Sequence, residues 1–180
     1  MRRLGPTPAA VAYRLATLVD APEIAAVHVR GWQWGYRGLL PEALLASLSI
    51  PEREAMWRWA LAPGRGVRVW LAERNGRLLG FASCGPPRGP DEPEGAGELH
   101  AIYLEEEAAG TGMGRALLAR SASELVEAGY RSAILWVLDV NDRARRFYER
   151  AGWSHDGGVK REWMGETELR ELRYAVPLRR

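Results

Sequence analysis

A loop with three glycines at alternate positions is the first feature of this sequence that could do chemistry. Glycines at this spacing let backbone N–H groups turn toward one point, and the first turn of a following helix adds unpaired amides and a positive dipole end. The pattern predicts a site for an anion such as a pyrophosphate. An ordinary glycine turn that packs a helix on a strand is the competing interpretation. The loop reads Ala109-Gly110-Thr111-Gly112-Met113-Gly114-Arg115.

Two common phosphate-binding motifs do not fit this loop. A Walker A loop ends in Gly-Lys-Ser/Thr, and no lysine is present here. A dinucleotide fingerprint would need a glycine in place of Arg115 and an acidic residue about 20 positions later, where Leu135 and Trp136 stand. A nucleotide or dinucleotide enzyme is therefore disfavoured.

The elements that must position the loop can be placed by their periodicity. The first helix begins at Asp20, whose spacing to Glu23 fits a capping box, and runs to about Arg30. The aromatic segment 31–38 is expected to end it as a loop, and two short helices follow Pro41. Later helices are predicted at about 112–128 and 141–151. Strands are predicted at 11–18, 67–71, 77–84, 98–104, 132–138 and 169–177, with a hairpin at Asn75-Gly76.

Length and composition limit the class of protein. With 180 residues, 47% hydrophobic and 27% charged, the chain is expected to form a single domain over 11–180 after a loose leader at 1–10. A net charge of +2 argues against a nucleic-acid partner. No stretch of about 18 apolar residues predicts a membrane helix, so a soluble cytoplasmic protein is expected. The single Cys84, in an apolar run, and three unrelated histidines predict neither a disulfide nor a metal site.

Two motifs together resemble the GNAT superfamily of acyl-CoA-dependent N-acyltransferases. The loop is similar to the family's Gln/Arg-Gly-x-Gly-x-Gly/Ala signature, except that Ala109 replaces the first residue. A second signature, Asn-x-x-Ala-x-x-Phe-Tyr-Glu-x-x-Gly-Phe, is matched by Asn141, Ala144, Phe147, Tyr148, Glu149, Gly152 and Trp153. The resemblance spans about residues 12–178. It implies an α/β (α+β) fold with a mixed, mostly antiparallel sheet of about seven strands, flanked by helices and splayed between strands 4 and 5.

The resemblance also implies where acetyl-CoA would bind as cosubstrate. Its pantetheine arm would lie along the strand 98–104 and its pyrophosphate on the loop amides, which remain although Ala109 lacks the usual polar side chain. Asn141 would hydrogen-bond the arm. The residues assigned to acetyl-CoA in this way are Ile102, Tyr103, Leu104, Ala109, Gly110, Thr111, Gly112, Met113, Gly114, Arg115, Asn141 and Tyr148.

Amide formation from a thioester and an amine needs an oxyanion donor, a general base and an acid for the leaving thiolate. The resemblance implies the Ile102 amide as donor and Tyr148 as acid, although a tyrosine on a helix is by itself more often a packing residue. Glu98, acting through water, is the favoured base, because alternation puts it on one face with His100 and Ile102. His100 is the second candidate or a relay partner.

The acceptor side is less defined by the sequence. The family layout implies that Trp32, Trp34 and Tyr36 line it, and the competing interpretation is a hydrophobic patch or dimer surface. His28 lies on the apolar stripe of the first helix and is expected to be structural. The leading hypothesis is an acetyl-CoA-dependent N-acetyltransferase that acts on a primary amine of a small molecule or peptide. Under this hypothesis the protein uses no metal and has no nucleic-acid or membrane partner, and by family habit it is expected to form a homodimer. The alternative is a catalytically silent acyl-CoA-binding sensor domain.

Overall fold

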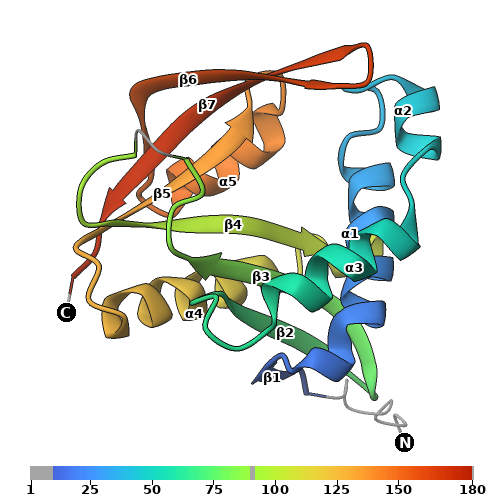
Figure 1. The fold of residues 1–180 in the computed structure, drawn as a ribbon, viewed down its shortest axis with the longest axis horizontal. Coiled ribbons are helices and arrows are strands. Elements are labelled where there is room, and N and C mark those ends of the chain that lie inside the picture. Colours follow the sequence, from blue (N-terminus) through green and yellow to red (C-terminus); the bar gives the residue numbers. More distant parts are fainter. Residues whose placement is uncertain (1–9, 90–91, 180) are drawn as a thin grey trace, which may run out of the picture.

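The computed structural model, which describes residues 10–89 and 92–179, contains a seven-stranded sheet in the order β1-β2-β3-β4-β5-β7-β6 (Figure 1). Neighbouring strands are antiparallel except β4 and β5, which are parallel, so the predicted mixed, mostly antiparallel sheet is confirmed. The predicted leader lies outside the described residues, except Ala10. The strands are β1 (Ala12–Leu15), β2 (Arg68–Arg74), β3 (Arg77–Gly85), β4 (Ala96–Leu104), β5 (Ser132–Leu138), β6 (Ser154–Met164) and β7 (Thr167–Pro177).

Helices cover both faces of the sheet and bury one apolar cluster on each (Figure 1). One face carries α1 (Ala21–Gly35) and α3 (Ile50–Ala60), with the short α2 (Glu42–Ala46) between them in the chain. The other carries α4 (Met113–Glu127) and α5 (Asp142–Arg150), and its cluster includes the fully buried Cys84. None of the helices in the described residues is both long and apolar enough to span a membrane.

The Asn75-Gly76 pair forms the predicted hairpin between β2 and β3. Both residues have positive φ angles, 55° and 73°, as a two-residue turn between twisted strands requires.

Helix α1 runs more than one turn beyond its predicted end near Arg30. A Cβ atom at Gly31 would lie 3.0 Å from the Cβ of Tyr103, so this glycine serves the close packing of α1 on β4 and does not stop the helix. The loop predicted over residues 31–38 is therefore wrong for residues 31–35, which are helical. Trp32 and Trp34 stand instead on the last turn of α1.

The sheet opens between its two central strands. β4 pairs with β5 only through Ala96–Glu98 against Ser132–Ile134, although β4 continues to Leu104 and β5 to Leu138. The predicted splay is confirmed. Since β5 continues its pairing with β7 along its whole length, the sheet consists of two parts that diverge from a short shared segment.

A β-bulge at His100 interrupts the alternation of β4. Ala101 lies opposite Ser83 and Leu99 opposite Cys84, which leaves His100 as the extra residue. Leu99 and Ile102 consequently pack on the α4 side, whereas Ala101 and Tyr103 pack on the α1 side. The predicted common face of Glu98, His100 and Ile102 is wrong, because the extra residue shifts the period by one.

Candidate functional site

The open edge of β4 presents backbone groups to the gap in the sheet. Glu105 N–H donates to the Leu79 carbonyl at 2.8 Å, which fixes the bonded pairs of the β3–β4 ladder. Because such pairs alternate, the amides of Ile102 and Leu104 point away from β3 and toward β5. The Leu104 carbonyl accepts a hydrogen bond from Trp34 Nε1 at 2.6 Å. The Ile102 amide is therefore an available donor in the gap.

The glycine loop adds a second group of unpaired amides beside this gap. Gly110 and Gly112 have φ angles of 74° and 91°, which disfavour other residues, and Gly112 stands directly before α4. The first helical hydrogen bond runs from Ala116 N–H to the Gly112 carbonyl. In the described part of the chain, the amides from Gly112 to Arg115 have no backbone acceptor, as at any helix start. This arrangement fits a pyrophosphate, and the exposed Arg115 side chain could reach it.

The remaining residues assigned to acetyl-CoA differ in what they present. Ala109 and Thr111 are exposed in the loop, whereas the Met113 side chain lies in the core, so only its amide is available. Asn141 Oδ1 accepts from Ala144 N–H and thereby caps α5, which leaves the amide nitrogen of its side chain for a ligand. Tyr103 directs its ring to the α1 side and not into the gap.

Two phenols meet on the α1 side of the sheet, and a third, that of Tyr148, lies near them from the other side. Tyr36 Oη and Tyr103 Oη are 3.4 Å apart. Tyr148, on α5, is 8% exposed, and burial followed by the proximity of Tyr103 raises the pKa of its phenol well above the ordinary value. Tyr148 therefore keeps its proton at neutral pH and can act only as a proton donor there.

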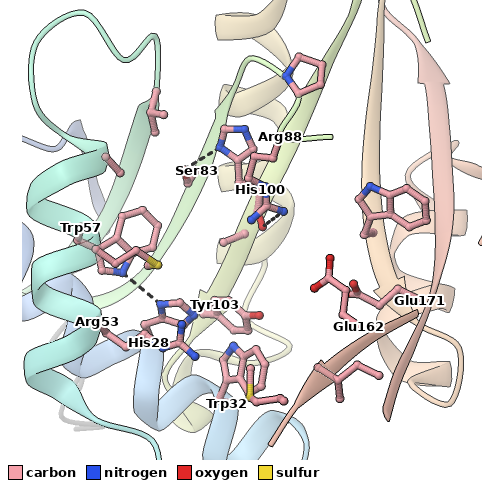
Figure 2. Close-up of a pocket in the computed structure, with 18 of the residues that line it drawn as sticks. His28, Trp32, Arg53, Trp57, Ser83, Arg88, His100, Tyr103, Glu162 and Glu171 are labelled. Carbon is pink, nitrogen blue, oxygen red and sulfur yellow. Dashed lines mark hydrogen bonds between the residues drawn. The ribbon is translucent and has the colours of Figure 1, made fainter. Parts of the chain in front are cut away.

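A cavity of about 640 Å³ lies between the α1–α3 face and the β6–β7 hairpin (Figure 2). Two of the three aromatic residues predicted for the acceptor side, Trp32 and Tyr36, line it. Trp34 does not, since its indole bonds the end of β4 and stacks against the Arg143 guanidinium at 4.3 Å. The prediction for Trp34 is not met at this cavity, because residues two positions apart on a helix point to nearly opposite sides, whereas Trp32 and Tyr36, four apart, share one side.

The two candidate bases differ in availability. Glu98 is 1% exposed, and its carboxylate accepts from the Arg88 backbone N–H at 2.8 Å and from the Arg88 guanidinium at 2.9 and 2.6 Å. It borders a neighbouring cavity of about 530 Å³, whereas His100 lines the larger one. His100 Nε2 lies 2.8 Å from the Pro86 carbonyl, so Nε2 carries the proton and Nδ1, 3.4 Å from Ser83 Oγ, is the basic atom. Burial lowers the pKa of His100.

Several charged residues of the larger cavity have no signal in the sequence. Arg53 comes from α3, and Glu162 and Glu171 come from the β6–β7 hairpin (Figure 2). Lys160 of the same hairpin also lines the cavity. Lys160 Nζ lies 3.0 Å from a carboxylate oxygen of each glutamate. Alternate residues of two paired strands share a face, but the pairing partners could not be known beforehand. Within the described residues, no group of three or more His, Cys, Asp or Glu side chains is arranged to hold a metal ion.

Known proteins share both the sequence pattern and the fold. The sequence profile described as the Acetyltransferase (GNAT) family matches residues 32–153. The chain is 42% identical over 133 residues to "Uncharacterized N-acetyltransferase YuaI" of Bacillus subtilis, which covers 73% of each chain. It is 31% identical over 153 residues to "Probable N-acetyltransferase Rv2775" of Mycobacterium tuberculosis, and this alignment covers 83% of each chain. The PaiA N-acetyltransferase of Thermoplasma acidophilum, solved in complex with coenzyme A, superposes with a TM-score of 0.70 over 93% of this chain and 99% of that one, at 18% identity.

Proposed function

Because the chain belongs to the acetyltransferase (GNAT) family, we propose that it transfers the acetyl group of acetyl-CoA to a primary amine of a small molecule or peptide. The observation that carries this proposal is the convergence of three features at one place. The Ile102 amide points into the opening of the sheet, and Tyr148 belongs to the same apolar cluster as Ile102. Tyr103, which lines the aromatic cavity, lies near Tyr148.

Acetyl-CoA fits the donors that surround this opening. The amides from Gly112 to Arg115 suit its pyrophosphate, and the edge of β4 at Ile102 and Leu104 suits the polar groups of the pantetheine arm. The cosubstrate would supply its acetyl group as a thioester, which an amine can attack. The chain would supply the Ile102 N–H to the carbonyl oxygen, and the Tyr148 proton to the departing sulfur.

A base must take the proton that the amine loses. We assign this to His100 in preference to Glu98, because His100 borders the acceptor cavity while the Glu98 carboxylate is held by Arg88. Burial lowers the pKa of His100, and the charge of Arg88 acts in the same direction, while the charge of Glu98 opposes both and would support His100 as the base. His100→Gln should slow turnover most at neutral pH and least at high pH, where the amine is already neutral. A constant loss across pH would remove His100 from this role.

The sensor hypothesis predicts binding without turnover, and Ala109 is the residue that keeps it open. Titration calorimetry of the protein with acetyl-CoA, with ATP and NAD as controls, tests the site. We expect selective binding of acetyl-CoA, followed by amine-dependent thiol release. Binding without thiol release for any amine would favour the sensor, and absence of binding would end both hypotheses.

A further inference from the structure

The acceptor cavity carries positive charge on one wall that no carboxylate of the described residues neutralises. Arg53 is half-buried at this wall and has no carboxylate oxygen within 4.0 Å among the described residues. Its guanidinium lies 5.6 Å from the centre of the Trp32 ring, an arrangement that leaves its N–H groups free. Arg65, exposed at the mouth over Trp59, adds a second cation. By contrast, Arg58 on the same helix is paired with Glu54 and lies outside the cavity.

A buried imidazole stands beside Arg53 on the same wall. His28 is 6% exposed, lines the cavity and accepts a hydrogen bond at Nδ1 from Trp57 Nε1, at 3.1 Å. The proton of the neutral ring is therefore on Nε2, which has no hydrogen-bond partner among the described residues. Arg53 and His28 thus offer unpaired hydrogen-bond donors to the same space (Figure 2). Neither of these groups can accept a hydrogen bond from the ammonium group of an amine.

The opposite wall has the other sign of charge. Glu162 and Glu171 face the cavity from the β6–β7 hairpin (Figure 2). Both pair with a single ammonium, that of Lys160. One negative charge therefore remains on this wall. Glu171 lines the same cavity as Tyr36 and Tyr103. Burial raises the pKa of both phenols, and the charge of Glu171 adds a smaller effect in the same direction.

We propose that the acceptor is a small molecule that carries a carboxylate as well as its primary amine, with the carboxylate bound by Arg53 and His28. A guanidinium matches a carboxylate with two parallel hydrogen bonds, and the aromatic side chains around it reduce competition from water. The amine end is drawn toward the hairpin carboxylates and the opening of the sheet. The inference rests on the proposed acetyl transfer and narrows its substrate to amino-acid-like molecules.

Pairs of acceptors that differ only in charge test this assignment. Each pair consists of an amino acid and its carboxamide, and the panel includes α-amino acids and longer ω-amino acids, so that several spacings are covered. The amide is nearly the same size as the acid, and its amine loses a proton more readily, so the chemistry alone favours the amide. We expect kcat/KM for the preferred acid to exceed that of its amide by about tenfold or more, since charged hydrogen bonds are involved.

Variants locate the effect in the cavity. Arg53→Gln should bring the acid-to-amide ratio close to one without changing the Kd of acetyl-CoA, and Arg53→Lys should retain part of the preference. Arg58→Gln makes the same change of charge on the same helix and should leave the ratio unchanged.

The proposal is overturned if amides react as well as the acids, if only amines without a carboxylate react, or if Arg53→Gln slows both members of a pair equally. In these cases thiol release still supports acetyl transfer. If acetyl-CoA itself does not bind, the proposed function fails, and the acceptor assignment fails with it.

Discussion

At the residue scale, the protonation state of Tyr148 determines what it can contribute. Its raised pKa keeps the phenol protonated, so Tyr148→Phe removes a proton donor and retains the ring that packs against Phe147 and Trp153. We expect kcat to fall about 100-fold. The Kd of acetyl-CoA, measured by calorimetry, should be nearly unchanged. Tyr130→Phe, at the opposite end of β4, serves as the control, and equal turnover in Tyr148→Phe and the parent would exclude the phenol as the acid.

His28 gives the fold a pH dependence. Burial, and to a lesser extent the charge of Arg53, lowers the pKa of His28 from 6.5 to about 3. Between these two pKa values His28 is protonated in the unfolded chain and neutral in the folded chain. The free energy of unfolding therefore falls as the pH decreases from about 6.5 toward 3. His28→Gln should reduce the loss of unfolding free energy between pH 6 and 4 by up to about 1.4 kcal/mol per pH unit, measured by urea denaturation. His100, whose pKa is also lowered, should retain its own share; an unchanged slope would contradict the prediction.

At the scale of elements, helix α4 offers a matched comparison between its two ends. Gly112 and Gly129 have φ angles of 91° and 92°, and a Cβ atom on either would meet no atom within 4 Å. Alanine at either position should therefore destabilise the fold similarly, by about 1–2 kcal/mol, through backbone strain alone. Only Gly112→Ala should also weaken acetyl-CoA binding, because it disturbs the amides at the helix start. Calorimetry on both variants checks this, and equal affinities would mean that the loop does not hold the ligand.

The elements themselves could be predicted where local signals dominate. The Asn75-Gly76 hairpin, the strand at 132–138 and the helix after Gly112 follow from turn residues and apolar period. Two features of these elements could not be predicted from the local sequence. The bulge at His100 depends on pairing with β3, and the continuation of α1 through Gly31 depends on contact with Tyr103, neither of which the local sequence records.

At the scale of the whole molecule, the two parts of the sheet are joined by only a short parallel segment of β4 and β5. A ligand that contacts both parts should stabilise the fold as a unit. Acetyl-CoA at 100 times its Kd adds about 2.7 kcal/mol, which raises the Tm by about 5–10 °C for a chain of this size. Thermal denaturation with acetyl-CoA, and with ATP as control, measures this. A similar shift with ATP would show that the acetyl-pantetheine arm contributes nothing to binding.

The candidate site was only partly predictable from the sequence, because some of its residues form contiguous motifs and others are brought together only by folding. The glycine loop and the segment from Asn141 to Trp153 are contiguous motifs, so they could be found in the sequence. By contrast, Arg53 and Glu171 are far apart in the sequence and line the same cavity only in the folded protein, so the sequence could not show that they belong to one site. Glu98 has the expected position on β4, yet its pairing with Arg88 across the 85–97 loop was not foreseeable.

The burial of Cys84 has a practical consequence. Its side chain is inaccessible, and burial raises the pKa of the thiol to about 12, so the chain has no thiolate available to attack a disulfide reagent. Colour developed by such a reagent during turnover would report released coenzyme alone, without a protein background. A cysteine introduced on the β6–β7 hairpin would be the single reactive thiol of the protein. A fluorophore attached to it could follow acceptor entry in real time.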